Sequence, residues 1–282
     1  MTNQDLTIII TTFKSQDKVE KCLNSIDPDL KIIIIENSND QKFKNYIQSK
    51  FSNTQCILTG DNLGYGKANN IGLKIIKSKY CLILNPDTEL DKNSITNFFY
   101  SIKQKLNFAI IGPDQNEKSL LLKTKNNQSN FNPIKVNSIK GYAMFLNMEK
   151  FTKIGFFDEN FFLYLEEIDL CRRVIKAGEN IYIDNNIKVF HHGGQSVDAN
   201  FSYQIKLTKN WHWMWSLFYY NKKHYSFFFA FCSVFPKLFS SVIKIFFYSI
   251  LFERKKKEIY LSRLSGLVNS ILGKPSWQRP NL

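Results

Sequence analysis

Acid and amide side chains follow directly after apolar runs of this chain, a placement that suits the binding of a metal ion and a diphosphate. Asn85-Pro86-Asp87 comes after the apolar run that ends at Leu84. A hard divalent cation on a diphosphate needs one or two protein carboxylates, because phosphate oxygens and water supply its other ligands. Asp87 is therefore a candidate metal ligand, and a plain helix N-cap is the alternative.

A glycine-rich segment, residues 61–72 (D-N-L-G-Y-G-K-A-N-N-I-G), joins a predicted strand to a predicted helix. Backbone N–H groups at a helix N-terminus, together with the ammonium group of Lys67, can meet an anionic ligand. The spacing matches neither a P-loop nor a G-x-G-x-x-G dinucleotide fingerprint. The segment indicates an anion-binding turn, with a tight turn that binds nothing as the alternative.

Aromatic residues surround a cluster of acids in residues 157–170 (F-D-E-N-F-F-L-Y-L-E-E-I-D-L). Glu166, Glu167 and Asp169 cannot share one face of a helix, since neighbouring positions diverge by about 100°. One carboxylate can point into a cleft while another caps the helix or pairs with an arginine. A carboxylate among aromatic rings has a raised pKa, which suits a general base near neutral pH. Acids placed for the helix dipole are the alternative.

A histidine pair, His191-His192, ends a predicted strand and is followed by two glycines. An imidazole in that position is free to reach a metal ion or a phosphate. A structural or solvated pair is the alternative. Only the presence of the other motifs supports a ligand-binding role for these histidines.

Short β-branched runs alternate with longer amphipathic segments in the first third of the chain. They predict strands at residues 6–12, 31–36, 55–59 and 80–85, and helices at 17–26, 41–51 and 67–77. This alternation predicts an α/β fold with a mostly parallel central sheet flanked by helices. Ligands of such folds bind beyond the carboxyl ends of the strands, where the polar motifs above fall.

The second half of the chain returns to regular structure after a polar stretch, residues 115–133, which we interpret as a loop or weak hairpin. A strand is predicted at 140–147, helices at 148–154 and 166–177, and two short strands that end at His192. The five cysteines are widely spread with no C-x-x-C pair, which fits a reducing cytoplasm and argues against a zinc site. No signal peptide is predicted.

The net charge of +14 belongs to the tail, because residues 1–200 carry +3 and residues 201–282 carry +11. Residues 203–220 predict an aromatic helix that packs in a core, with contact to an acceptor or a membrane as the alternative. Residues 225–252 are apolar, but their longest uncharged run is twelve residues, short of the roughly 20 that a simple membrane span needs.

The polar groups of this apolar segment are ordered along one helical stripe, which consists of Ser233, Lys237, Ser240, Ser241, Lys244 and Tyr248. Arg254-Lys255-Lys256-Lys257 follows directly. We therefore expect a helical, membrane-associating extension that lies in the interface of an anionic membrane, with lysines reaching the headgroups. Packing on the preceding part of the chain or on a second subunit is the alternative. Nucleic acid is disfavoured as a partner, since the charges accompany bulky apolar residues.

In this order and at these separations, the motifs resemble those of the family-2 glycosyltransferases of the GT-A fold, most closely their rhamnosyltransferase-like branch. The resemblance covers about residues 5–200 and depends on the strings N-L-G-Y-G-K-A-N-N-I-G, N-P-D and F-x-Y-x-E-E-x-D-L-C-x-R. It implies a catalytic domain at 1–200, with a nucleotide-sugar half at about 1–112 and an acceptor and base half at about 138–200, followed by a tail at 201–282.

The resemblance also implies roles for individual residues. Glu167 is the expected catalytic base, and Asp87 and His191 are the expected ligands of a Mg or Mn ion. The residues expected to bind the nucleotide sugar are Thr11, Glu36, Asn62, Gly64, Lys67, Asn70 and Asn85. The acceptor region is expected at Tyr164, Glu166 and Asp169. Glu36 and Glu167 stand where the family usually has Asp, which makes catalysis depend on how the longer side chains are placed.

The activity implied is inverting transfer of one sugar from a nucleotide-diphosphate sugar to a glycan acceptor at the cell surface. The apolar, basic tail is the reason to expect that this acceptor is lipid-linked. The branch points to dTDP-rhamnose, and UDP sugars stay open, as does the oligomeric state. The Q-x-x-R-W string of processive members is absent from the sequence. The expected location is cytoplasmic, peripheral at the inner face of the cytoplasmic membrane. A catalytically inactive glycan-binding or scaffold subunit and a sugar-phosphate nucleotidyltransferase are the alternatives.

Overall fold

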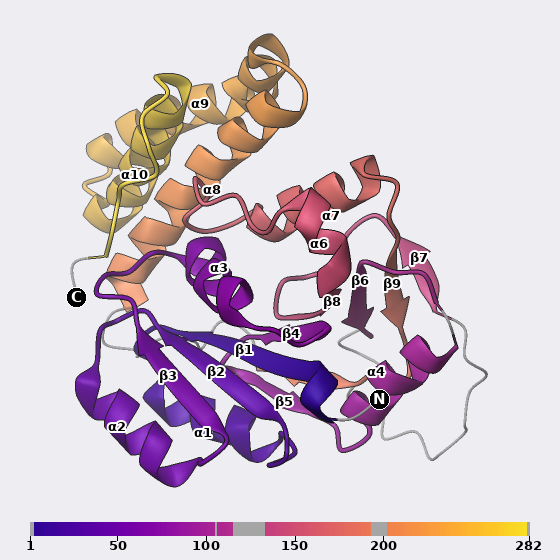
Figure 1. Cartoon of the computed structure of the whole chain (residues 1–282). Helices are drawn as coiled ribbons and strands as arrows, with labels where there is room; N and C mark the ends of the chain where they lie inside the picture. Colours follow the sequence, from indigo (N-terminus) through magenta and orange to yellow (C-terminus); the bar gives the residue numbers. More distant parts are fainter. Residues whose placement is uncertain (1–2, 105, 115–132, 193–201, 281–282) are drawn as a thin grey trace. The chain divides into compact units, whose positions relative to one another are not determined.

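The structure is a computed structural model that describes residues 3–104, 106–114, 133–192 and 202–280 (Figure 1). The stretch predicted as a loop or hairpin lies almost wholly outside the described residues. The chain divides into two compact units, the first made of residues 1–157 and 167–197 and the second of residues 158–166 and 198–282. We describe each unit by itself, and the predicted division at residue 200 stays a prediction.

The first unit is built on an eight-stranded sheet with the order β3-β2-β1-β4-β8-β6-β9-β7. Its strands are β1 (Leu6–Thr12), β2 (Lys31–Glu36), β3 (Thr54–Leu58), β4 (Tyr80–Leu84), β6 (Ile110–Pro113), β7 (Ile134–Val136), β8 (Ala143–Asn147) and β9 (Ile181–Asp184). β1 to β4 pair in parallel, as do β6 and β9, whereas β8 is antiparallel to β4 and β6, and β7 to β9. The predicted α/β fold with a mostly parallel sheet is confirmed.

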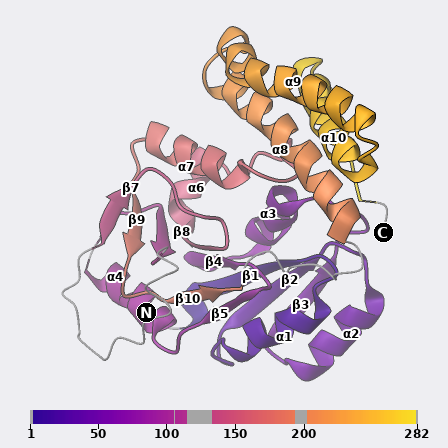
Figure 2. The ribbon, with the colours of Figure 1, turned by 180° about the vertical axis from the view of Figure 1, so that it is seen from behind.

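Apolar residues fill both faces of this sheet because successive side chains of a strand point to opposite sides. In β1, Ile8 and Ile10 belong to one core and Ile9 to the other. The first core receives side chains from α1 (Gln16–Asn24), α2 (Gln41–Lys50) and α4 (Ser94–Lys103). The second receives them from α3 (Tyr65–Ile75), α6 (Met148–Ile154) and α7 (Glu166–Lys176), so helices cover both faces (Figure 2).

A separate two-stranded sheet joins distant parts of the first unit. It pairs β5 (Thr88–Leu90) with β10 (Val189–His191) in antiparallel fashion, with His191 opposite Thr88. Neither β5 nor the longer α4 was predicted from the sequence, whereas the strands and helices predicted in the first third agree with the structure to within two residues at each end.

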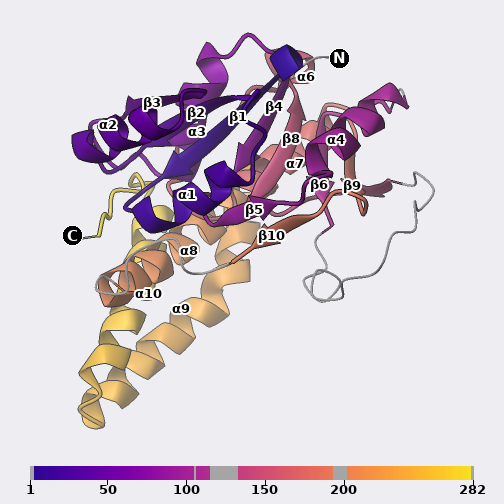
Figure 3. The ribbon, with the colours of Figure 1, turned by 90° about the horizontal axis from the view of Figure 1, so that it is seen from below.

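The second unit contains three long helices, α8 (Ser202–His224), α9 (Phe227–Ile250) and α10 (Arg254–Ile271), which pack side by side (Figure 3). Their shared core is formed by Met214, Phe218, Ala230, Val234 and Leu267. The sequence predicted the first two helices but treated the basic run after them only as a charge cluster. In the structure that run is instead the first turn of α10.

Close contact between α8 and α10 depends on a glycine. A Cβ atom at Gly266 would lie only 2.2 Å from the carbonyl oxygen of Trp211. Trp211 itself is almost fully buried, and its indole N–H donates to the Ser265 hydroxyl at 3.1 Å. The backbones of the two helices can therefore approach each other only where a side chain is missing.

We expect Gly266→Ala to destabilise the second unit by about 2 kcal/mol, because the helices must separate to admit the methyl group. Alanine favours an isolated helix by about 1 kcal/mol over glycine, so a loss would report the tertiary clash. Urea unfolding followed by tryptophan fluorescence measures the change. Leu261→Ala, at a 42% exposed position of the same helix, is the control and should cost less than about 1 kcal/mol. An unchanged midpoint for Gly266→Ala would contradict the close packing.

Candidate functional site

The first polar group of the candidate site lies at the end of β2. Glu36 is 2% exposed, and its carboxylate accepts hydrogen bonds from the Thr12 hydroxyl and from both the hydroxyl and the main-chain N–H of Ser38, the last at 2.7 Å. The neighbouring Thr11 hydroxyl has no hydrogen-bond partner among the described residues. The predicted pair thus sits at the end of adjacent strands, but the carboxylate of Glu36 is already well bonded.

Asn37, to which the sequence analysis gave no role, organises the glycine-rich turn. Its side-chain oxygen accepts from the N–H of Leu63 at 2.9 Å, and its amide nitrogen donates to the Gly64 carbonyl and to Asn62 Oδ1 at 3.2 Å each. Gly64 precedes α3 with φ of 81°, a left-handed conformation that favours glycine. The turn that contains the predicted residues Asn62 and Gly64 is therefore preformed. Its position directly after a strand was the available signal for Asn37.

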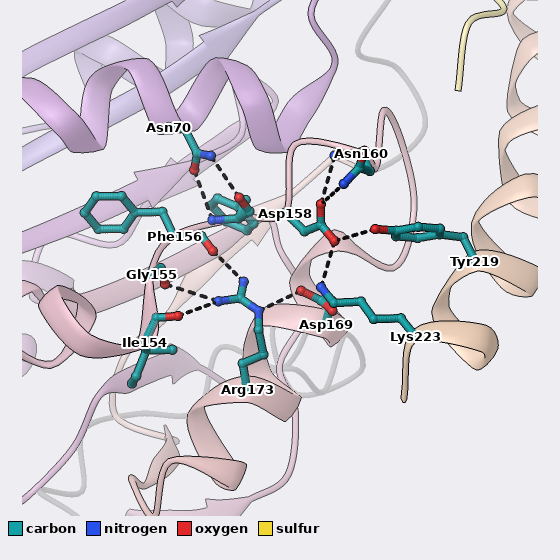
Figure 4. Close-up of polar contacts among 11 residues, drawn as sticks. Asn70, Ile154, Gly155, Phe156, Asp158, Asn160, Asp169, Arg173, Tyr219 and Lys223 are labelled. Carbon is teal, nitrogen blue, oxygen red and sulfur yellow. Dashed lines mark hydrogen bonds and ion pairs between the residues drawn. The ribbon is translucent and has the colours of Figure 1, made fainter. Parts of the chain in front are cut away.

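The two predicted residues on α3 have different surroundings. Lys67 is exposed, near the N-terminal end of the helix. Asn70 is 3% exposed, donates to the Phe157 carbonyl at 2.9 Å and accepts from the Phe157 N–H at 3.0 Å (Figure 4). Because both amide atoms of Asn70 bond to the main chain, the geometry favours a structural role over the predicted contact with a nucleotide sugar.

The predicted metal ligands lie next to each other. Nε2 of His191 lies 3.5 Å from Oδ1 of Asp87, whose side chain is almost fully buried. The His192 N–H donates to the Asp87 carbonyl at 3.0 Å, and the β5–β10 ladder continues from this point. The ring of His191 stacks on Tyr142 with centroids 4.6 Å apart. Residues more than 100 positions apart in the chain thus meet at one point.

Asn85 belongs to the same neighbourhood. Its N–H donates to the carbonyl of Tyr142 at 2.9 Å, the residue on which His191 stacks. The carboxylate oxygen of Asp87 is a ligand that suits Mg and Mn ions, and the imidazole nitrogen of His191 adds a softer donor beside it. No group of three or more His, Cys, Asp and Glu that could hold a metal ion occurs in the part of the chain that the structure describes. A metal ion would therefore need further ligands from the diphosphate and water.

Glu167 occupies the first turn of α7 and is partly buried. A Cβ atom at Gly141 would lie 3.4 Å from Cβ of Glu167, so the side chain rests on a position without a side chain. The Tyr65 hydroxyl donates to the Gly141 carbonyl at 2.5 Å and braces this position. Burial raises the pKa of Glu167, and hydrogen bonds from the N–H groups of Glu167 and Ile168 oppose that rise only in part.

Asp169 has a structural task in the same helix. It is fully buried and accepts from Nε of Arg173 at 2.8 Å. The guanidinium group of Arg173 also donates to the carbonyls of Ile154 at 2.9 Å and Gly155 at 3.3 Å, and to that of Phe156 (Figure 4). This arrangement, which we call the arginine clamp, fixes the turn before Phe157. Asp169 was predicted in the acceptor region, but its carboxylate is engaged in the clamp.

The other residues predicted for the acceptor region belong to the second unit. Tyr164 and Leu165 have φ values of 72° and 68°, both left-handed, directly before the buried Glu166. Burial, with a smaller effect from the charge of Glu166, raises the pKa of Tyr164 to about 12. The Tyr164 ring packs edge to face on Trp213 of α8. Two successive non-glycine residues in this conformation are costly, a pattern typical of functional segments.

Asp158 is a second carboxylate of this unit, and no role for it was predicted from the sequence. Asp158 accepts from Nζ of Lys223 at 2.7 Å, from the Tyr219 hydroxyl at 3.0 Å and from the N–H of Asn160 at 2.9 Å (Figure 4). Burial would raise the pKa of Asp158, but the hydrogen bonds from Lys223 and Asn160 lower it below its ordinary value. The carboxylate is therefore ionised and ties its loop to α8.

Comparison with known protein families identifies the family to which this chain belongs. Residues 7–172, more than half of the chain, match the model of glycosyl transferase family 2. The chain therefore belongs to glycosyl transferase family 2, is rhamnosyltransferase-like, and is a glycosyltransferase.

Three curated relatives carry the resemblance further. The hexosyltransferase Agl10 of low-salt glycan biosynthesis in Haloferax volcanii is 28% identical over 72% of this chain and 72% of its own. Rhamnosyltransferase WbbL of Escherichia coli K12 is 26% identical over 71% of this chain and 90% of its own. The N-acetylglucosaminyl-diphospho-decaprenol L-rhamnosyltransferase of Mycobacterium tuberculosis is 20% identical over 68% of this chain and 77% of its own.

A solved structure supports the fold. The mannosyltransferase PcManGT of Pyrobaculum calidifontis, in complex with GDP-Man and Mn2+, superimposes with a TM-score of 0.55 at 9% identity, over 96% of this chain and 88% of its own. At that identity the likeness shows the fold alone, which is GT-A.

Because it leaves the Arg173 guanidinium among carbonyl groups without a counter-charge, Asp169→Asn should lower the free energy of unfolding by about 3 kcal/mol. Chemical denaturation of the purified protein measures the loss. Glu179→Gln is the matched control, since it breaks an ion pair with Lys150 at 3.0 Å in which both side chains are over 20% exposed. That change should cost less than about 1 kcal/mol. Equal losses for the two variants would refute the structural task given to Asp169.

Proposed function

We propose that the protein is an inverting glycosyltransferase that moves one sugar from a nucleotide-diphosphate sugar to a lipid-linked glycan acceptor. The observation that carries the proposal is the meeting of Asp87 and His191, 3.5 Å apart, at the point where β4 ends and the β5–β10 ladder begins. This point lies at the carboxyl end of parallel strands, where ligands of α/β sheets bind.

In the proposed site Asp87 and His191 hold a divalent cation, Mg or Mn. The carboxylate of Asp87 suits such ions, and the complex of PcManGT with GDP-Man and Mn2+ offers a parallel in a protein of the same fold. When bound, the ion supplies positive charge that stabilises the diphosphate as it leaves. The residues of the chain bind the rest of the donor.

We assign donor binding to the ends of β1 and β2 and to the preformed turn. Thr11 and Glu36 would meet the base and ribose, and Lys67 with the first N–H groups of α3 would meet phosphate oxygens. Hydrogen-bonding groups that are already in place lower the activation barrier of the transfer, because they need no reorganisation as negative charge develops on the leaving oxygen. The names of the relatives support a rhamnosyl or other hexosyl donor, with dTDP-rhamnose as the first to test.

Glu167 is the proposed general base. Its carboxylate would take the proton of the acceptor hydroxyl while that oxygen forms a bond to the anomeric carbon and the bond to the diphosphate breaks. The sugar thereby inverts in one displacement, and no second carboxylate nucleophile is required. A raised pKa makes Glu167 a stronger base than an ordinary glutamate.

The proposed acceptor is a glycan carried on a lipid, which would place the enzyme at the inner face of the cytoplasmic membrane. The support is the mycobacterial relative, an N-acetylglucosaminyl-diphospho-decaprenol L-rhamnosyltransferase. Nucleoside diphosphate release separates this proposal from an inactive glycan-binding subunit.

Glu167→Gln tests the base. We expect kcat to fall about 100-fold or more, because the amide cannot accept the proton. The melting temperature should not fall, since burial disfavours the charged carboxylate in the folded state and glutamine removes that charge. In the unchanged protein, kcat/KM should decline with acid at a pH above the ordinary glutamate value of 4.5, because the base must be ionised. Full activity of Glu167→Gln combined with inactive Glu166→Gln would overturn the assignment.

Asp87→Ala tests the metal site. Turnover and its dependence on Mg or Mn should disappear together, as measured by nucleoside diphosphate release. Glu89→Gln is the matched control, because Glu89 lies two residues away and pairs with His192 at 2.8 Å instead. The control should keep its metal dependence. Metal-stimulated turnover by Asp87→Ala would contradict the proposed ligand.

A thermal-shift screen of dTDP, UDP and GDP sugars with Mn then identifies the donor, since a bound ligand raises stability.

A further inference from the structure

One side of α9 is apolar and exposed along its whole length within the second unit. We call this side the outward face of α9. It is defined by six exposed apolar residues, which are Phe228, Phe235, Phe239, Ile243, Phe246 and Ile250. Their side chains are between 50% and 77% exposed. On an α-helix these positions fall within about 80° of the circumference, and no charged residue of α9 lies in that arc. A contiguous apolar surface of this kind marks an interaction site.

The opposite side of α9 is where the helix is anchored. Ala230, Val234 and Ser241 are buried there, and the first two pack with Met214 of α8 and Leu267 of α10. The outward face is therefore not the side of α9 that forms the core of the second unit, because that other side already packs against α8 and α10.

Three members of the polar stripe predicted from the sequence contact α8 or α10. The Ser233 hydroxyl accepts from the Asn221 amide of α8 at 3.1 Å. Lys244 Nζ lies 4.9 Å from the ring centroid of Tyr260, on which Tyr248 stacks. The structure thus separates the two sides that a membrane-surface helix needs, with polar groups at one edge and apolar side chains outward.

A cluster of positive charge adjoins the outward face at its C-terminal end. Phe252 is 93% exposed in the turn after α9, and α10 begins with Arg254, whose side chain is 89% exposed. Lys255, Lys256 and Lys257 follow, and the tail from residue 201 contains only two acidic residues. Each basic residue close to an anionic membrane surface favours binding, so the cluster complements anionic headgroups.

We infer that the outward face of α9 docks on the anionic leaflet of a lipid bilayer, with the helix flat in the interface and the first turn of α10 at the headgroups. The length and composition of α9 would also allow it to cross a membrane. Crossing would, however, carry α8 and the charged α10 into the hydrocarbon with it, because both helices pack along α9. A second copy of the chain is a poor occupant, since its tail also carries a net +11.

This inference deepens the proposed function by naming how the protein reaches a lipid-linked acceptor, and it depends on that function only for the choice of leaflet. Binding to vesicles is measured without donor or acceptor. If the unchanged protein does not bind anionic vesicles, the docking surface alone is refuted. Loss of transfer by Glu167→Gln bears on the chemistry alone.

A native reporter lies on the outward face. Cys232 is exposed, whereas the other four cysteines of the chain are buried. With the intact protein, a water-soluble maleimide should label one thiol, and vesicles with 30% phosphatidylglycerol should slow that labelling at least tenfold. Vesicles of phosphatidylcholine alone should protect much less. Labelling that is equally fast with anionic vesicles would overturn the proposal, and so would protection that rises with protein concentration alone, which would indicate a second copy.

Flotation with the same vesicles tests the apolar contacts. Phe239→Ser with Phe246→Ser should reduce bound protein at least tenfold. Ile75→Ser with Ile134→Ser removes two similarly exposed apolar side chains from the first unit, 47% and 51% exposed, and should leave binding unchanged. Circular dichroism confirms that both variants are folded. Equal binding by the two variants would refute the outward face as the contact.

The basic cluster is tested separately. Changing residues 254–257 to serine should reduce binding to anionic vesicles at least tenfold and remove its sensitivity to salt. The matched control changes four exposed lysines of the first unit to serine, namely Lys31, Lys42, Lys77 and Lys153.

Extraction at high pH then distinguishes the orientation of α9, because a helix that lies flat in the interface is released from the vesicles. Retention after such extraction would favour a spanning helix and overturn the flat one.

Discussion

The arginine clamp is the interaction on which the geometry of the first unit depends. A guanidinium group among main-chain carbonyls needs a counter-charge, and the fully buried Asp169 supplies it from the same helix. Asn70 holds the next residue, Phe157, from α3. Side chains of two helices thereby fix the same short stretch of main chain. Glu167 lies on the helix that carries the arginine clamp. The position of the proposed base therefore depends on hydrogen bonds of Asp169 and Arg173 that take no part in the chemistry.

The Asp87–His191 pair shows the same dependence of chemistry on a structural contact. Three residues of β5 pair with three of β10, and this short ladder sets a histidine beside a carboxylate. Closing so long a stretch of chain costs conformational entropy, which the buried apolar residues Leu90 and Val189 of the ladder help to offset. The two groups are therefore held near each other by packing that does not itself involve a ligand.

The sequence predicted the fold well where burial on both faces leaves continuous apolar runs, as in β1 and β2. The predicted placement of Glu36 and Asp87 at or just after the ends of buried strands agrees with the structure, whereas their roles in ligand binding stay predictions. The sequence did not predict that Asn70 bonds to the main chain of Phe157 or that Asp169 pairs with Arg173. The predicted roles of both residues in the site stay predictions. The helix α10 was missed because its packing depends on a contact between Gly266 and Trp211, distant in sequence.

The distribution of the cysteines has a consequence for oxidation. Burial raises the pKa of Cys22, Cys56 and Cys171 to about 12 each, and that of Cys81 as well, so these thiols do not form reactive thiolates. Cys232 is then the one exposed thiol of the chain. A chain with a single such thiol can join one other chain through a disulfide, but cannot be cross-linked further. Disulfide cross-linking in solution is thus limited to covalent dimers, which a reductant reverses.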